Sequence, residues 1–170
     1  MSKLAKLFSL ITIILFSNVV HASENHVVKM LNNGTTGSMV FEPAFIKINT
    51  GDSITFEMTD AGHNAVTVAG PSGSSPFDTK YKPSTTVKFD VNGIYLYKCT
   101  PHAMMAMAGL IQVSDSSNKV EMAKDIGRFE GRVRKRNVKT RKYGILKRNL
   151  KEYCRICRDL ISMPVCIFSS

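Results

Sequence analysis

Short alternations of apolar and polar residues run from Glu24 to about Val113, broken by glycine, proline, asparagine and aspartate. A period of two is typical of β-strands with one face buried, and Ile54, Phe56 and Met58 show it clearly. No convincing helical pattern interrupts the series. Seven or eight short strands in ~90 residues predict an all-β protein built as a two-sheet β-sandwich, which is large enough to fold alone.

The expected strands cover residues 27–31, 46–48, 54–58, 65–68, 86–89, 94–98 and 110–113. We expect them to pair antiparallel, and the turn at Gly51-Asp52 predicts a hairpin between the second and third strands. The pattern changes after Ser114. Ser116 or Ser117 can cap a helix there, so we expect one or two C-terminal helices, the first carrying Val120, Met122, Ala123 and Ile126.

The net charge of +10 is distributed unevenly along the chain. Residues 23–126 hold eight lysines and ten acidic residues, whereas residues 127–170 hold thirteen basic residues, every arginine among them, against three acidic ones. The basic character therefore belongs to the tail. The slightly acidic segment before it gives no reason to expect nucleic acid as a partner.

The tail, residues 127–170, also contains Cys154, Cys157 and Cys166. Its basic runs could contact nucleic acid or an anionic membrane surface, and Cys154-x-x-Cys157 could form a zinc site or a redox pair. A single CxxC pair lacks the second pair of ligands that a structural zinc site needs. We interpret the tail as a basic extension that is poorly ordered, or as sequence introduced by a shifted reading frame.

Residues 1–22 have the pattern of a secretory signal peptide. Lys3 and Lys6 precede an apolar run over residues 7–16, and Val20-His21-Ala22 places small residues before a cleavage site. This run is shorter than the ~20 residues of a membrane-spanning helix. We therefore expect cleavage near Ser23, no stable membrane insertion afterwards, and export to an oxidising compartment.

Cys99 is the single cysteine of residues 23–126, and an unpaired thiol in an exported protein needs protection. His102 follows three residues later, Met107 eight residues later, and His63 lies 36 residues upstream. One thiolate, two imidazoles and a thioether suit a mononuclear copper site with a His₂Cys plane and a weak axial sulfur, a geometry used for one-electron transfer. We also expect Asn64 to tie the two ligand loops together.

The motifs Cys99-Thr-Pro-His102, Met107 and Gly62-His63-Asn64 resemble the blue-copper ligand pattern of the cupredoxins, and among these the pseudoazurins. Segments 26–31, 39–48, 51–56 and 97–102 are similar to that family in order and spacing. The resemblance implies a Greek-key sandwich, residues 23–126 as the copper-binding domain, and His63, Cys99, His102 and Met107 as ligands of one type 1 copper. Met105 is the alternative axial ligand, but the family-like spacing of residues 108–111 favours Met107.

The resemblance also implies a periplasmic carrier that shuttles single electrons between partners such as c-type cytochromes, copper nitrite reductase and other denitrification reductases. We expect a monomer and no enzymatic activity, because the sequence shows no second metal cluster, catalytic triad or paired acids. The alternative is an envelope copper-binding or copper-delivery protein, which would use its methionine-rich loop to pass Cu(I) to an acceptor.

Docking of such partners is expected at the loop end around His102. Small and apolar residues would form the contact surface, and three lysines would attract an acidic partner, although two lysines such as Lys80 and Lys82 are more often than not an ordinary solvated edge. The residues of this surface are Gly62, Pro101, Ala103, Met104, Met105 and Ala106, and the lysines are Lys80, Lys82 and Lys98.

Overall fold

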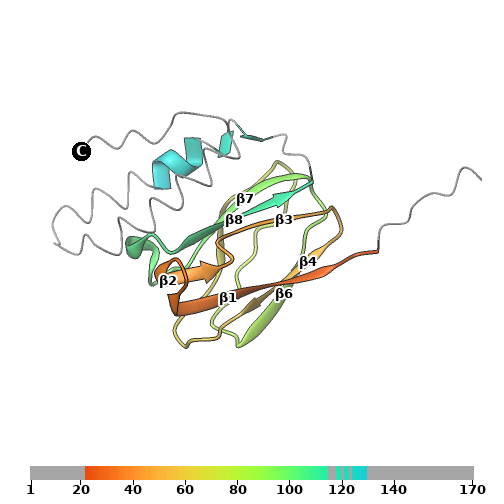
Figure 1. Ribbon diagram of the computed structural model, residues 1–170. Coiled ribbons are helices and arrows are strands. Elements are labelled where there is room, and N and C mark those ends of the chain that lie inside the picture. The colour runs from red at the N-terminus through yellow and green to blue at the C-terminus, as the bar shows by residue number, and fades with distance from the viewer. Residues whose placement is uncertain (1–21, 115–117, 120, 123, 130–170) are drawn as a thin grey trace, which may run out of the picture.

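The structure is a computed structural model that describes residues 22–114, 118–119, 121–122 and 124–129 (Figure 1). These residues form two four-stranded β-sheets and a helix, so the expected two-sheet β-sandwich is confirmed. The hydrophobic stretch of the expected signal peptide, the expected caps Ser116 and Ser117, and residues 130–170 of the basic tail lie outside the described residues.

The two sheets are built from strands that are not neighbours in sequence, as in a Greek key. One sheet has the spatial order β2 (Gly37–Glu42), β1 (Asn25–Gly34), β4 (Ser53–Glu57) and β6 (Ser84–Lys88). The other has the order β3 (Phe45–Ile48), β8 (Ala108–Val113), β7 (Gly93–Lys98) and β5 (Val66–Ala69). A short 3₁₀ helix, η1 (Ala103–Met105), lies between β7 and β8, and residues 119, 121–122 and 124–129 are helical.

Two expectations about strand pairing are wrong. β1 pairs with β4, and β3 with β8, in parallel rather than antiparallel register. The hairpin expected across Gly51 does not form either, because β3 and β4 belong to different sheets. Gly51 has a φ of +91°, a left-handed conformation that glycine adopts easily, and this turn leads the chain from one sheet to the other. Alternation shows that one face of a strand is buried, but it does not identify the neighbouring strand.

β2 is a strand that the period-two pattern does not predict. Its central residues Val40 and Phe41 are adjacent in sequence, yet both are buried, at 6% and 1% exposed. Met39, immediately before them, has a φ of +54°, which interrupts the regular strand geometry. The irregular backbone explains why alternation is lost in this strand.

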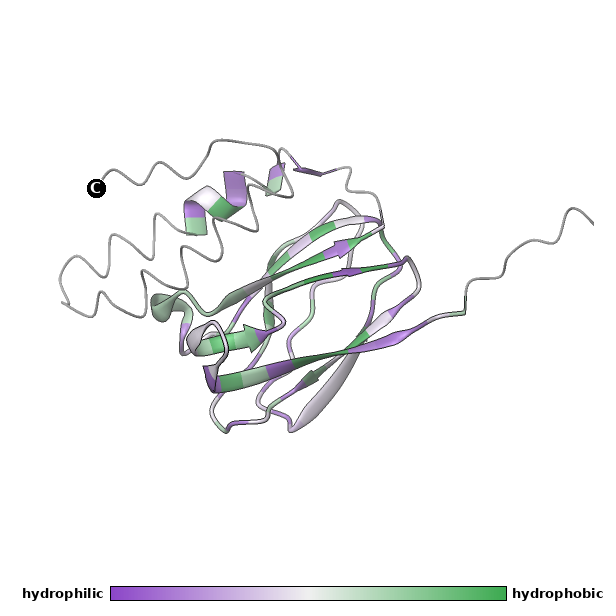
Figure 2. Cartoon of the chain, viewed as in Figure 1, coloured by the Kyte–Doolittle hydropathy of each residue, from purple (hydrophilic) through white to green (hydrophobic). Residues whose placement is uncertain are grey.

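The core between the two sheets is rich in aromatic rings. The ring of Tyr97 lies edge-on to Phe41 and Phe56, with centroid separations of 4.7 and 5.3 Å. Figure 2 shows apolar residues distributed along strands of both sheets. This core also contains Cys99 and Met107, so it extends to the end of the sandwich where the expected metal ligands lie.

A second apolar cluster covers the outer face of the β3-β8-β7-β5 sheet, where the helical residues pack (Figure 1). Met122, Ile126 and Phe129 join strand residues such as Leu96 and Leu110 in this cluster. All six residues of β8 are buried as a result. The expected helix is thus present, and Phe129, at 4% exposed, is buried although it lies beyond the expected domain boundary at residue 126.

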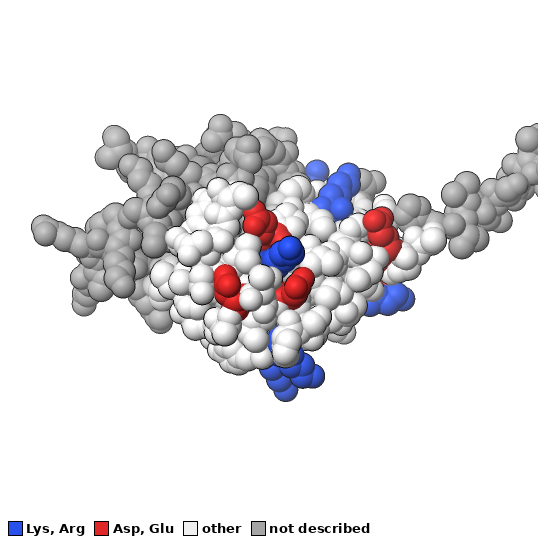
Figure 3. All heavy atoms as spheres, turned by 60° about the horizontal axis from the view of Figure 1, so that its bottom comes forward, with Lys and Arg blue, Asp and Glu red and all other residues white. Residues whose placement is uncertain are grey.

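Acidic and basic side chains are interspersed on the face shown in Figure 3, where neither sign dominates. Among the described residues, Lys88 and Asp90 form a surface ion pair at 2.9 Å, and Arg128 and Asp125 form another at 3.1 Å. Within the described part of the chain, no helix is long and apolar enough to cross a lipid bilayer.

Candidate metal centre

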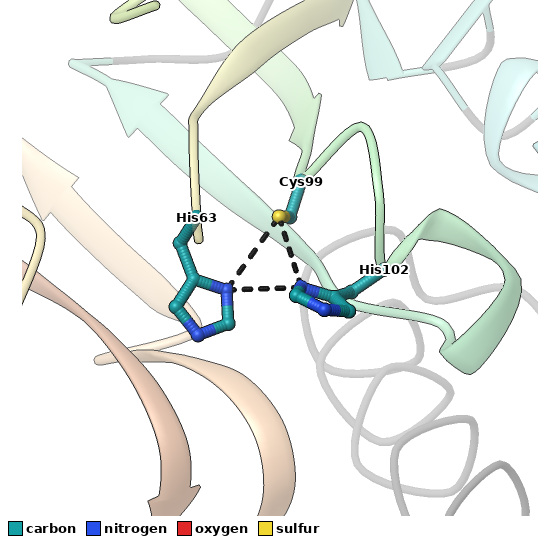
Figure 4. Close-up of side chains that lie close together, drawn as sticks. All are labelled: His63, Cys99 and His102. Atoms are coloured by element: carbon teal, nitrogen blue, oxygen red, sulfur yellow. Dashed lines mark hydrogen bonds between the residues drawn. The ribbon is translucent and has the colours of Figure 1, made fainter. Parts of the chain in front are cut away.

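Three chain segments meet at one end of the sandwich and bring together His63, Cys99 and His102 (Figure 4). His63 lies in the loop between β4 and β5, Cys99 directly follows β7, and His102 directly precedes η1. Antiparallel pairing of Val66 with Lys98 places the start of β5 beside the end of β7. Strand pairing therefore closes the long sequence gap between the first histidine and the cysteine.

The three donor atoms form a nearly equilateral triangle. Sγ of Cys99 lies 3.6 Å from Nδ1 of His63 and 3.5 Å from Nδ1 of His102, and the two nitrogens are 3.1 Å apart. A point equidistant from all three lies about 2.0 Å from each, which matches the ~2.0–2.1 Å of metal–nitrogen bonds in proteins. His63 and Cys99 are fully buried, whereas His102 is partly exposed. The triangle therefore fits a small metal ion shielded from solvent on most sides.

The imidazole of His63 is oriented by Asn32, whose side-chain oxygen lies 3.1 Å from Nε2. With this oxygen as the acceptor, Nε2 carries the proton and the lone pair of Nδ1 faces the other two donor atoms. Sequence reasoning missed Asn32 because it lies 31 residues upstream on β1 and belongs to no recognisable motif. Only the position of β1 beside β4 brings it to the site.

Burial sets the protonation of all three candidate ligands. It lowers the pKa of His63, which the neighbouring His102 lowers further, and it also lowers the pKa of His102. Both imidazoles are thereby favoured in the neutral form that binds metals. Burial raises the pKa of Cys99, although hydrogen bonds from the backbone N–H groups of Asn64 and His102 act in the opposite direction. The thiol would therefore lose its proton when a metal binds.

Asn64 joins the two ligand loops, as the sequence predicts. Its side-chain oxygen accepts a hydrogen bond from the Thr100 backbone N–H at 2.7 Å, and its Nδ2 donates to Thr100 Oγ1 at 3.2 Å. Asn64 is 4% exposed, so these bonds are largely shielded from water. Because Asn64 follows His63 and Thr100 follows Cys99, the two hydrogen bonds fix the separation of the histidine and the thiol.

The two candidate axial methionines occupy different environments. Met107 is 1% exposed and lies in the same buried cluster as Cys99, whose backbone N–H donates to the Met107 carbonyl at 3.0 Å. This bond extends the β7–β8 ladder beyond Lys98 and Ala108, so Met107 lies opposite Cys99. Met105 is in η1 and only partly buried. The buried environment of Met107, next to Cys99, therefore suits a thioether donor better than that of Met105.

Only part of the contact surface expected around His102 is exposed. Pro101 and Gly62 are exposed, and residues 103–105 are partly exposed. Ala106, however, is 6% exposed and packs in the cluster beneath the C-terminal helix, so its assignment to the surface is wrong. Its φ of +61° ends η1 and turns the chain inward toward Met107.

Comparison with known proteins identifies the family. Residues 28–114 match the copper binding proteins of the plastocyanin/azurin family. The chain belongs to this family, the cupredoxins. A putative pseudoazurin of Rhizobium leguminosarum bv. viciae is 48% identical over 114 residues, which cover 66% of this chain and 74% of the relative. The pseudoazurin of Methylorubrum extorquens is 44% identical over 107 residues, covering 62% and 72% respectively.

Solved structures agree with this placement. The crystal structure of pseudoazurin from Methylobacterium extorquens AM1 superposes on this cupredoxin with a TM-score of 0.59 at 32% identity, covering 79% of this chain and 98% of the other. A pseudoazurin from Sinorhizobium superposes with a TM-score of 0.54 at 38% identity, covering 56% and 78%. The expected resemblance to pseudoazurins is thereby confirmed.

Pseudoazurins and other cupredoxins are electron-transfer carriers and not enzymes. This cupredoxin is therefore a copper protein and an electron carrier. Its thiolate and imidazole donors, with a buried thioether nearby, are the ligand types of a type 1 site, so the residues present fit one copper ion.

Proposed function

We propose that this cupredoxin is a periplasmic type 1 blue-copper protein in which His63, Cys99 and His102 bind copper in a trigonal plane. The observation that carries this proposal is the triangle of donor atoms, which lie within 4.8 Å of one another and come from three different segments of the chain. We further propose Met107 as the axial ligand, because it lies opposite Cys99 in the buried core.

The bound copper ion would take up and release one electron by alternating between Cu(I) and Cu(II). The surrounding residues would keep the donor atoms in place during this change. Asn32 holds the His63 ring, Asn64 holds the two loops together, and the backbone bond from Cys99 to Met107 joins the thiol to the axial residue. His102, the one partly exposed member of the triangle, would be the point at which the electron enters or leaves.

Export rests on the signal-like pattern of residues 1–22 and on the contacts that begin just after it. Ser23 Oγ donates to the Gly51 carbonyl at 2.7 Å, and the Glu24 backbone N–H donates to Asp52 Oδ1 at 2.8 Å. We propose cleavage before Ser23, which would leave these contacts intact. Because Phe129 is buried against the sheet, we place the end of the folded domain at or beyond this residue and treat the following basic segment as an extension.

The partners that we propose are c-type cytochromes and copper nitrite reductase, which this monomeric carrier would reach by diffusion. Resemblance to pseudoazurins supports the choice, and the small residues around the exposed part of His102 support contact at that end. Contact there would bring the copper close to the partner's own redox centre.

The test of the copper site is a visible and EPR spectrum of the copper-loaded protein. We expect an intense thiolate-to-Cu(II) absorption and its loss in Cys99→Ser. The absence of this absorption from the wild-type protein would overturn the assignment. Cleavage before Ser23 would be checked separately, by the intact mass of protein recovered from the periplasm.

The axial ligand is tested with a matched pair of variants, Met107→Leu and Met105→Leu. We expect a shift of the reduction potential and of the EPR parameters in the first variant only, because the axial donor tunes a type 1 site. Equal shifts in both variants, or a shift in Met105→Leu alone, would contradict the choice of Met107.

The copper-delivery alternative predicts a different exchange behaviour. A carrier should retain its copper through repeated redox cycles in the presence of a Cu(I) chelator. Rapid loss of Cu(I) to a chelator that does not unfold the protein would favour delivery through the methionines of η1.

A further inference from the structure

A strained turn lies at the same end of the sandwich as the proposed copper site. Lys80 and Tyr81 have φ angles of +52° and +42°, and the Lys82 backbone N–H donates to the Thr79 carbonyl at 3.2 Å. Two consecutive left-handed residues closed by this bond are the features of a type I′ turn, which strongly prefers asparagine and glycine. Lysine and especially tyrosine are unfavourable in this conformation, since their Cβ atoms approach the following carbonyl oxygen.

Burial of the side chain does not compensate for this strain. Tyr81 is 54% exposed, and Val27 is the other large apolar residue that is exposed in the described part of the chain. Lys80 and Lys82 are exposed as well, and neither forms an ion pair among the described residues. The fold thus exposes a tyrosine ring between two lysines, and it does so at a cost in stability. A backbone outlier of this kind suggests a function.

The base of the turn is rigid. Thr79 is 1% exposed; its backbone N–H donates to the Ala65 carbonyl at 3.0 Å, and its Oγ1 accepts from the Ala65 N–H at 2.9 Å. The carboxylate of Asp78 accepts a bond from the Lys80 N–H at 2.8 Å. These contacts hold the strained conformation in place, so the Tyr81 ring projects from a fixed support.

The same contacts place the turn at the copper end of the sandwich. Phe77 bonds to Thr67 and Thr79 bonds to Ala65, so the chain runs antiparallel to residues 65–67 and reaches the level of His63 as it enters the turn. After the turn, Ser84 pairs with Glu57, the last residue of β4, and β6 leads away again. The turn therefore lies on the same end of the molecule as the proposed ligands.

We propose that the Lys80–Tyr81–Lys82 turn is a docking point for the acidic surface of a redox partner, with the Tyr81 ring as the anchor. This inference rests on the proposed electron-transfer function. A rigid tyrosine loses little conformational entropy on binding and buries a large area, and such residues are frequent hot spots. Lys80 and Lys82, which form no ion pair among the described residues, select a partner that presents carboxylates around the site where the ring binds.

The test uses the full-length, copper-loaded protein in the Cu(I) state, mixed with purified copper nitrite reductase in a stopped-flow instrument. Tyr81→Asn removes the ring but suits the left-handed backbone, and it should lower the second-order rate about tenfold, as for a hot-spot residue. Tyr81→Phe keeps the ring and should react within about twofold of the wild-type rate. The matched control is Val27→Thr, which removes exposed apolar surface elsewhere and should leave the rate unchanged.

Two further measurements separate docking from structural damage. Tyr81→Asn should raise the thermal midpoint, because asparagine relieves the turn, and it should keep the wild-type rate of oxidation by ferricyanide, which needs no protein docking surface. A Tyr81→Asn protein that reacts with the reductase as fast as wild type would overturn the proposal. An equal slowing with ferricyanide would also overturn it, since the residue would then act on the metal site.

An electrode coated with a mixed carboxylate- and methyl-terminated monolayer provides a second acidic partner. If wild-type protein fails to react with the reductase but keeps its blue copper spectrum, the reductase is not its partner, and the electrode decides the docking proposal. Slower electron exchange for Tyr81→Asn than for Tyr81→Phe on this surface would support the anchor. Equal exchange rates would refute it, whereas loss of the blue spectrum would instead refute the proposed function.

Discussion

The hydrogen bonds between Asn64 and Thr100 make a sharp test of how the candidate copper site is held together. Asn64→Ala removes the 2.7 Å bond from the Thr100 backbone N–H and the 3.2 Å bond to Thr100 Oγ1. The first loss leaves a partly buried N–H without its acceptor, at about 1–2 kcal/mol, and the second adds about 0.5–1 kcal/mol. We therefore expect Asn64→Ala to lower the free energy of unfolding by about 2–3 kcal/mol.

The matched variant is Thr100→Val, which keeps the backbone N–H and removes only the hydroxyl. It should cost about 0.5–1 kcal/mol. The double variant should then lose less free energy of unfolding than the sum of the two single losses. The difference should be about 0.5–1 kcal/mol, because the shared hydroxyl bond is lost only once. Guanidinium denaturation of the copper-free protein measures all four proteins without the added stabilisation from bound metal.

The copper-loaded proteins provide an independent readout of the same bonds. Loosening the loops should shift the reduction potential more in Asn64→Ala than in Thr100→Val, because only the first variant frees the backbone next to Cys99. If Asn64→Ala costs no more stability than Thr100→Val, the bond to the backbone does not hold the two ligand loops together and the reasoning is wrong.

Three other predictions concern the scaffold. Tyr97→Phe should stabilise the fold by about 1 kcal/mol in denaturant titrations, because the fully buried hydroxyl has no hydrogen-bond partner among the described residues; a destabilised variant would contradict this. Gly109→Ala should cost about 2–3 kcal/mol, since the new Cβ would lie 2.3 Å from the Tyr97 ring, and an unchanged midpoint would count against that packing. The Glu24 backbone N–H holds the pKa of buried Asp52 below its usual 3.8, so stability from this group should be complete above that pH and lost as the pH falls through the lowered pKa. Unfolding midpoints measured between pH 7 and 2 should show this loss in the wild-type protein and a weaker one in Asp52→Asn.

The parts of the fold that sequence could predict are those in which a strand buries one face. β4 shows this, because Ile54 and Phe56 are fully buried while the residues between them are not. β7 could be located by its flanking turn and its terminal cysteine, although residues 93–97 are all buried. β2 could not be predicted from the sequence. Met39 interrupts the strand geometry, and the adjacent residues Val40 and Phe41 are both buried, so buried and exposed positions do not alternate. The pairing of strands could not be predicted either, since parallel contacts such as β3 with β8 join residues 65 positions apart, for example Phe45 and Leu110.

The candidate site also contains residues that the sequence could predict and one that it could not. His63, Cys99 and His102 could be chosen from their chemistry and spacing, and the donor triangle agrees with that choice. Asn64 could be foreseen because it neighbours a ligand. Asn32 could not, because its role depends on the pairing of β1 with β4 and on the position of one side-chain amide. Residues that touch ligands from distant strands carry no sequence signature of their own, so they appear only in the folded protein.

The arrangement of these supports also bears on electron transfer. The three members of the donor triangle are attached to different parts of the sandwich: His63 to β1 through Asn32, Cys99 to the residue before β8 through the Met107 carbonyl, and His102 to η1. The bonds between Asn64 and Thr100 then join two of these parts across the site. A change in the charge of a bound metal would therefore act against several elements at once, and the His63 ring could not move far without breaking its bond to Asn32. A scaffold that holds its ligands nearly fixed in both oxidation states lowers the cost of reorganisation, which is what a carrier of single electrons requires.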